Sequence, residues 1–276
     1  MPGVPDPLYV AARHALLDAI EALSAHLDAV VLVGAQAVYL HTGSTQLAVA
    51  PYTTDADLAL DPVRLAAKPL LEDLLGGAGF SRSANDVGAW TKEVSVEGLP
   101  RSMVVDFLVP SSLGGPGRRG ARIPPHDRLT ARKVLGLEGV LVDRDVNRIT
   151  SLEASDTRAL NVSVAGPAGL LVAKIFKIGE RAGDADRRSD KDALDVFRLL
   201  QAVSTDEFAR RMRALRAEER SRAVTEQALA QLPVLFGSPR AIGSTMAARA
   251  AAPLEAEDTI AAATAVLARD LIVATG

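Results

Sequence analysis

Cysteine is absent from the 276 residues of this chain, and histidine is scarce. Without cysteine the protein can form no disulfide, no thiolate metal site and no cysteine nucleophile. The four histidines lie far apart in the sequence and never approach the spacing of zinc ligands, which argues against a structural zinc site. Hydrophobic residues (48%) and charged residues (24%) stand in the proportion of an ordinary globular protein that can bury a large core.

The sequence also lacks any segment typical of a membrane span or a secretory leader. Residues 29–54 carry no charge, but they are rich in Gly, Ser, Thr, Gln and Pro, which excludes a spanning helix. The first residues lack the basic and apolar regions of a signal peptide. Together with the absence of cysteine, this predicts a cytoplasmic protein with no membrane partner.

Hydrophobic spacing predicts two different parts of the chain, which meet at residues 166–167. The first part mixes helical periods with short β-branched runs, and the second part follows a helical period from residue 168 onward. We therefore predict an α+β fold in which residues 1–165 form a mixed sheet with flanking helices and residues 166–276 form an all-helical domain. In the first part, the expected helices cover residues 7–27, 35–41 and 63–75, the expected strands cover residues 29–33, 53–60, 90–96 and 102–109, further strands or hairpins fall within 129–164, and residues 111–125 form a loop.

Four Asp-x-Asp pairs occur in the chain, and only one has a context that suggests chemistry. Asp55 and Asp57 begin an apolar strand, where side chains two residues apart point to the same side, about 7 Å from each other. Two carboxylates held in this way can share a hard divalent cation such as Mg²⁺. The other pairs have simpler explanations: Asp143/Asp145 fits a charged hairpin turn, and Asp184/Asp186 and Asp190/Asp192 fit solvated or capping positions near a helix start.

A third acid and a glycine extend this candidate site. Asp106 interrupts the apolar strand 103–109, and a carboxylate in such a strand needs a partner. If this strand lies beside that of Asp55 and Asp57, three carboxylates converge, as in two-metal sites for phosphoryl transfer. Alternatively, Asp106 faces solvent or pairs with an arginine. Gly34 follows a buried strand and lets backbone N–H groups approach a phosphate, although a tight turn alone would also explain it.

Residues 33–60 resemble the nucleotidyltransferase superfamily with a DNA polymerase β-type core, through the segments V-G-A-Q-A-V-Y-L-H-T-G and Y-T-T-D-A-D-L-A-L. Within it, the resemblance is to AbiE-type and MenT-type nucleotidyltransferase toxins and their uncharacterised relatives. It implies that Asp55, Asp57 and Asp106 bind Mg²⁺ or Mn²⁺. It also implies that the nucleotide phosphates meet Gly34 and Ala35. Because Ala35 stands where the family often has Ser or a second Gly, backbone N–H groups or a hydroxyl such as that of Thr54 would make that contact.

A second segment is similar to the same toxin family. A lysine-bearing helix at residues 167–177 is followed by R-S-D-K-D-A-L-D at residues 188–195. Helical spacing predicts one shared face for Lys174, Lys177 and Arg181 on the first helix, and for Lys191 and Asp195 on the second. The resemblance implies that Lys174 contacts the nucleotide phosphates, and that the wall of the nucleotide cleft is completed by Arg181, Lys191, Asp192 and Asp195. A surface ion-pair network is the alternative explanation of these residues.

These features predict a metal-dependent nucleotidyltransferase that transfers NMP from an NTP to an acceptor hydroxyl. By resemblance, the acceptor is the 3′ end of a tRNA, and the chain is the toxin of a toxin–antitoxin pair with a cognate antitoxin as partner. Transfer to a protein or a small molecule is one rival prediction, and a catalytically silent nucleotide-binding or regulatory protein of the same fold is the other. If the acceptor is RNA, the arginine-rich residues 118–133 and 210–222 are the expected phosphate contacts.

Overall fold

The computed structural model describes residues 5–43, 53–180, 187–252 and 255–276, without the side chains of residues 187–189. Two short 3₁₀ helices, η1 (Ser24–Ala29) and η2 (Glu138–Leu141), occur among the regular elements. The strands are β1 (Val30–Val33), β2 (Asp55–Leu60), β3 (Ser81–Arg82), β4 (Ala89–Val96), β5 (Leu99–Pro110), β6 (Arg132–Val134), β7 (Arg144–Thr150) and β8 (Ala159–Ala165). The α-helices are α1 (Pro7–Ala22), α2 (Gly34–Thr42), α3 (Leu71–Gly77), α4 (Pro167–Glu180), α5 (Arg187–Ala202), α6 (Thr205–Ala217), α7 (Glu219–Phe236), α8 (Ile242–Ala251) and α9 (Glu257–Thr275).

The chain forms two compact units, each built from more than one stretch of sequence. The sheet unit consists of Met1–Gln36, Ala50–Val134 and Arg144–Val164, and the helical unit consists of Ala37–Val49, Leu135–Asp143 and Ala165–Gly276. A mixed sheet with flanking helices, followed by a helical C-terminal part, confirms the predicted α+β class. The assignment of separate roles to residues 1–165 and 166–276 stays a prediction.

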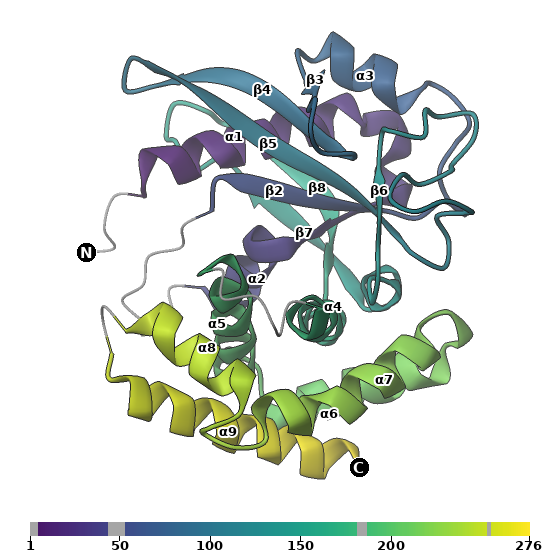
Figure 1. Cartoon of the computed structure of the whole chain (residues 1–276). Coiled ribbons are helices and arrows are strands. Elements are labelled where there is room, and N and C mark those ends of the chain that lie inside the picture. The colour runs from purple at the N-terminus through teal and green to yellow at the C-terminus, as the bar shows by residue number, and fades with distance from the viewer. Residues whose placement is uncertain (1–4, 44–52, 181–186, 253–254) are drawn as a thin grey trace. The chain divides into compact units, whose positions relative to one another are not determined.

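Within the described residues, the sheet has eight strands, in the order β3-β4-β5-β2-β1-β8-β7, with β6 paired to β5. Strands β2 and β5 run parallel, as do β1 and β8, whereas β1 with β2 and β4 with β5 are antiparallel. Strand β1 has the sequence Val-Val-Leu-Val and is buried at every position, because it lies between β2 and β8. Helix α1 packs against β2, β4 and β5 (Figure 1). The middle of the sheet is therefore the core of this unit.

Helix α1 begins where local sequence favours a helix start. The Asp6 carboxylate accepts a hydrogen bond of 2.8 Å from the backbone N–H of Leu8, and Pro7 occupies the first helical position, where no N–H is needed. Leu16, Leu17 and Ile20 are fully buried further along the helix. Their burial accounts for the apolar spacing in the sequence, since it fixes the helix on the sheet.

The predicted helix over residues 63–75 is wrong in its first part. After β2 the chain turns at Asp61, whose carboxylate accepts a hydrogen bond of 3.1 Å from the backbone N–H of Val63. Helix α3 begins only at Leu71, directly after Pro69 and Leu70. Proline provides no backbone N–H and disfavours helical geometry at the residue before it, so a helix through Lys68 and Pro69 is excluded.

The core of the helical unit includes Phe197, Phe208 and Phe236, which are among the largest fully buried side chains of the protein. Helix α4 packs on α5, α6 and α7, and α8 packs on α5 and α9. None of the helices within the described ranges is long and apolar enough to cross a membrane.

The hairpin turn predicted at Asp143/Asp145 is wrong. Asp143 is buried, accepts a hydrogen bond of 2.9 Å from the backbone N–H of Gly169 in the first turn of α4, and forms an ion pair of 2.6 Å with Arg211 of α6. A carboxylate in that place satisfies a free N–H of the helix start and complements the helix dipole. Asp143 is therefore a structural residue of the helical unit.

Candidate active site

Three carboxylates come together on one face of the sheet. Strands β2 and β5 pair in parallel, with Asp57 directly beside Asp106 and Asp55 beside Val104. Neighbouring strands lie about 5 Å apart, and side chains of paired residues point to the same face. The alternate positions of the same strands face the other way and are buried, namely Ala56, Leu58, Val105 and Phe107. The convergence expected from the sequence is therefore present in the backbone of the sheet.

The environment of Asp106 is charged on both sides. The side chain is half-buried, and burial raises the pKa of its carboxyl, an effect that Arg132 opposes and the charge of Asp55 increases. Arg132 Nη2 lies 3.4 Å from Asp106 Oδ2. Asp106 thus lies beside the other two carboxylates. It also pairs with an arginine, which was an alternative explanation of this residue from the sequence. In the sequence, Arg132 is recognisable only as part of a basic stretch.

Gly34 is required where it stands. Its φ of +68° is in the left-handed region, which other residues enter only at a cost. A Cβ at this position would also overlap the carboxylate of Asp57. Glycine therefore lets the first turn of α2 lie directly against the Asp57 carboxylate. No larger residue fits here unless the α2 turn or the Asp57 side chain moves.

A buried polar chain that the sequence analysis missed supports the carboxylate strand. Arg13 of α1 and Gln36 of α2 are both almost completely buried. Arg13 Nε donates to Gln36 Oε1 (2.8 Å), and Gln36 Nε2 donates to the backbone carbonyl of Asp55 (3.3 Å). Arg13 also donates to the backbone carbonyl of Thr150 (3.2 Å). The signal available in the sequence was one arginine and one glutamine, each directly preceded by an apolar run.

The donor set of the three aspartates suits a hard divalent cation, because all of its ligands would be carboxylate oxygens. Their side chains, however, are engaged within the protein. Thr53 Oγ1 donates to Asp55 Oδ1, and Arg132 reaches Asp106. Within the described ranges, no group of three or more His, Cys, Asp or Glu side chains is arranged to hold a metal ion. The backbone positions thus fit a cation, while the carboxylates of Asp55 and Asp106 have protein partners in this structure.

The helical unit contains a second charged cluster, which is buried. Lys174 Nζ lies 2.6 Å from Asp192 Oδ1 and 2.7 Å from Asp195 Oδ2, and its side chain is only 7% exposed. Burial alone would lower the pKa of Lys174, but the two carboxylates raise it above its usual value. The same lysine, with Lys177, holds the pKa of Asp192 below its usual value against the effect of burial. Lys174 and Asp192 are therefore both charged at neutral pH.

Two further residues connect this cluster with the end of α2 and with the surface. Arg198 lies 3.5 Å from Asp195 and stacks over the ring of Tyr39 at 5.3 Å. Burial raises the pKa of the Tyr39 hydroxyl to about 12, with a further contribution from Asp195. Lys177 contacts Asp192 at 3.0 Å, while 45% of its side chain stays exposed. The cluster therefore presents Lys177 to solvent and keeps Lys174 inside.

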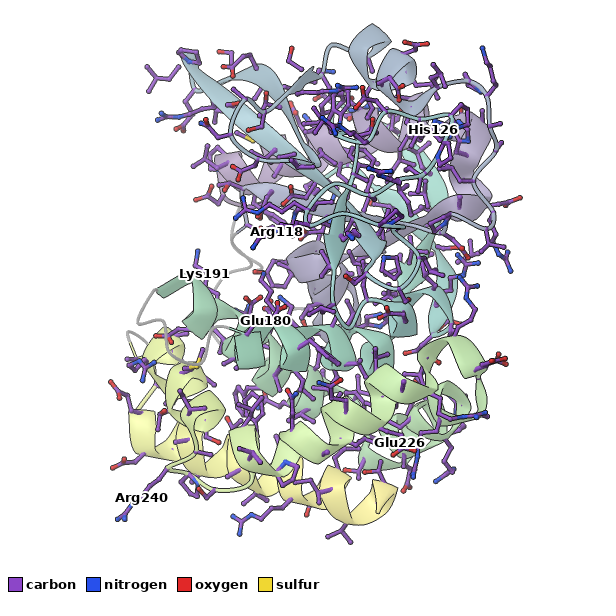
Figure 2. The ribbon with its side chains drawn as sticks, turned by 45° about the vertical axis from the view of Figure 1, so that its right-hand side comes forward. Arg118, His126, Glu180, Lys191, Glu226 and Arg240 are labelled. Atoms are coloured by element: carbon purple, nitrogen blue, oxygen red, sulfur yellow. The ribbon has the colours of Figure 1, made fainter. Side chains whose placement is uncertain are left out.

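The remaining predicted residues lie in different surroundings. Ala35 and Thr54 are half-buried, in the first turn of α2 and directly before β2, and the hydroxyl that contacts Asp55 is that of Thr53. Lys191 is exposed on α5, where its side chain extends from the helix (Figure 2). Arg181 lies outside the described residues. The sheet unit thus holds the acids, Gly34, Ala35 and Thr54, and the helical unit holds Lys174, Lys191, Asp192 and Asp195.

Carboxylates on adjacent central strands, next to a glycine turn that opens a helix, are typical of enzymes that transfer phosphate-containing groups. A family model described as Nucleotidyltransferase matches residues 12–219, a range that includes both charged clusters. The chain therefore belongs to this nucleotidyltransferase family and is a transferase. Comparisons with curated proteins and with solved structures found no match.

Proposed function

We propose that this protein transfers NMP from an NTP to an acceptor hydroxyl, with a divalent cation (Mg²⁺ or Mn²⁺) held by Asp55, Asp57 and Asp106. The observation that carries this proposal is the register of the parallel strands, which pairs Asp57 with Asp106 and leaves Asp55 two residues away on the same face. Membership of the nucleotidyltransferase family gives independent support for NTP as the substrate.

The residues of the sheet unit have distinct roles in the proposed reaction. The acceptor oxygen forms a bond to the α-phosphorus, the bond to the pyrophosphate leaving group breaks, and Asp106 accepts the hydroxyl proton. A raised pKa suits Asp106 to this role. Gly34 and Ala35 direct backbone N–H groups of the α2 start to the phosphates, with the Thr54 hydroxyl beside them. A bound cation would neutralise phosphate charge and favour loss of the acceptor proton.

In the helical unit, we propose that Lys191, with Arg181, contacts the nucleotide phosphates and that Lys174, Asp192 and Asp195 form the base of that surface. The double ion pair of Lys174 supports a positioning role for it, because a lysine that already satisfies two carboxylates has little capacity for a third anion. Lys177, which shares Asp192 and is partly exposed, is an additional candidate for a phosphate contact.

The finer parts of the proposal rest on resemblance to AbiE-type and MenT-type toxins. They are a tRNA 3′ end as the acceptor, a role as the toxin of a toxin–antitoxin pair with a cognate antitoxin, and a cytoplasmic location. The rival proposal, a silent nucleotide-binding protein, is favoured by one observation, which is that Ala35 provides no hydroxyl to the phosphates.

Label transfer separates these proposals. The protein is incubated with Mg²⁺ and each α-³²P-labelled NTP, with and without bulk tRNA, and Asp57→Asn is compared with Glu93→Gln, which changes an exposed acid of β4. We expect covalent label with wild type and Glu93→Gln, and a loss of at least about a hundredfold with Asp57→Asn. No label with any NTP, together with thermal stabilisation by NTP that persists in a chelator, would favour the silent protein.

A further inference from the structure

Positive charge is concentrated in one loop of the sheet unit. Residues 118–133, which we call the arginine loop, contain six of the 31 basic residues of the chain and one of its 34 acidic residues. Because the chain as a whole has a net charge of −3, this concentration is not a consequence of its composition. The basic residues are Arg118, Arg119, Arg122, Arg128, Arg132 and Lys133.

The two ends of the arginine loop are held together by backbone hydrogen bonds. The Lys133 N–H donates to the Arg119 carbonyl (2.8 Å), and the Ala121 N–H donates to the Ala131 carbonyl (2.9 Å). Between them, Gly120 and Arg132 form an antiparallel bridge. Lys133 Nζ also donates to the Gly115 carbonyl (3.0 Å). This pairing brings basic residues that are far apart in the loop sequence onto neighbouring segments of backbone.

Four guanidinium groups of the loop are exposed and not neutralised. They belong to Arg118, Arg119, Arg122 and Arg128, and Figure 2 shows Arg118. No residue within the described ranges forms an ion pair with any of the four. The single acid of the loop, Asp127, is turned to Arg82 at 3.4 Å. The loop thus presents positive charge that the described part of the chain does not balance.

One end of the loop is fixed at the carboxylates. Arg132 begins β6, which pairs in parallel with β5, and its side chain reaches Asp106. A polyanion lying along the loop therefore leads to the residue that we propose as the proton acceptor. We infer that the arginine loop is the docking surface for the phosphodiester backbone of a nucleic-acid acceptor. This inference rests on the proposed function and specifies the class of its acceptor.

The composition of the loop favours nucleic acid over an acidic protein. Protein interfaces concentrate binding energy in Trp, Tyr and Arg side chains, and residues 118–133 contain arginines but no Phe, Tyr or Trp beside them. Without stacking residues, exposed arginines on a loop are expected to contact mainly phosphates, which carry no sequence information. Binding should therefore tolerate any sequence and weaken steeply with salt. With four phosphate contacts, the affinity for a single strand should fall about 50-fold between 50 and 200 mM KCl.

Fluorescence anisotropy with the full chain tests the inference. The probes are fluorescein-labelled 20-nucleotide RNA and DNA of mixed sequence, and polyglutamate serves as competitor. The loop variant changes Arg118, Arg119, Arg122 and Arg128 to Gln, and a second loop variant changes them to Lys. A matched control removes the same charge from four exposed arginines outside both arginine-rich segments, namely Arg101, Arg148, Arg240 and Arg269, and circular dichroism verifies the fold of each variant.

We expect the Gln loop variant to lose most of its affinity and to weaken about threefold or less over the same salt range, while the Lys variant and the control bind as wild type does. Tighter binding of RNA or of DNA would identify the acceptor strand. An unchanged salt dependence in the Gln loop variant, a loss in the control instead, or equal competition by polyglutamate would overturn the inference. Thermal stabilisation of wild type and of the Gln loop variant by NTP and Mg²⁺ is measured alongside. Failure of the proposed function would abolish the chelator-sensitive part of this stabilisation in wild type, whereas failure of the inference alone would leave it intact in both proteins.

Discussion

Replacing Gly34 with alanine tests the contact between the α2 turn and the central carboxylate. The left-handed conformation costs a residue with a Cβ about 1 kcal/mol or more. The new methyl group also overlaps the Asp57 carboxylate, and rotating that side chain away from its preferred geometry costs about another 1 kcal/mol. We therefore expect Gly34→Ala to lose about 2–3 kcal/mol of stability in the sheet unit and to bind Mn²⁺ and NTP more weakly.

Gly98 provides a matched control in the same unit. Its φ of +78° is also left-handed, but a Cβ there would meet no atom within 4 Å. Gly98→Ala should therefore lose only about 1 kcal/mol and retain ligand binding. The single tryptophan, Trp90, is buried in β4, so urea unfolding followed by its fluorescence reports on this unit. Equal losses in the two variants, with equal ligand binding, would refute the contact.

Three further predictions concern the buried and half-buried charges. Lys174→Met leaves two buried carboxylates with one partner fewer and should destabilise the helical unit by about 3 kcal/mol. Lys177→Met, at the partly exposed lysine, should cost less than about 1 kcal/mol, and urea unfolding followed by far-UV circular dichroism measures both. Gln36→Leu leaves the Nε of the buried Arg13 without an acceptor and should cost about 2 kcal/mol by Trp90 fluorescence, and an unchanged midpoint would contradict the polar chain. Burial raises the pKa of the Asp18 carboxyl, but Lys92 and Arg158 bring that pKa below its usual value in the folded protein. The ionised carboxylate therefore stabilises the fold fully above about pH 4, the usual pKa of an aspartate, and this stabilisation is lost as the pH falls through the lower pKa of the folded state. The difference in melting temperature between wild type and Asp18→Asn should therefore shrink below about pH 4, and a constant difference would contradict this.

Much of the site formed by the three aspartates could be predicted from the sequence, because the alternation of side chains along a strand is a local property. The run around Asp55 and Asp57 and the acid inside residues 103–109 could be recognised from their apolar neighbours, and both strands formed as predicted. The pairing of Asp57 with Asp106 could not be read from the sequence, since register depends on residues far apart in the chain. The partner of Asp106, Arg132, was hidden for the same reason.

Helical periodicity gave less information about the second cluster. It placed Lys174 and Lys177 on one side of α4 but did not reveal that the first is buried and the second exposed. The depth of a residue depends on which helices pack around it, which periodicity along one helix does not contain. The polar neighbours of the Asp190/Asp192 pair predicted solvated or capping carboxylates, yet Asp192 is buried against Lys174. Asp143 was misjudged in the same way, since its partner lies 68 residues further along the chain.

The central claim is that the three aspartates of β2 and β5 bind a divalent cation, and Mn²⁺ binding tests it most directly. Free Mn²⁺ is measured by electron paramagnetic resonance during titration of wild type, Asp57→Asn and Glu93→Gln, each with an NTP analogue that cannot be cleaved between the α- and β-phosphates. We predict that Asp57→Asn weakens Mn²⁺ binding at least about tenfold, while Glu93→Gln binds as wild type does. Binding by Asp57→Asn that equals wild type would contradict the claim.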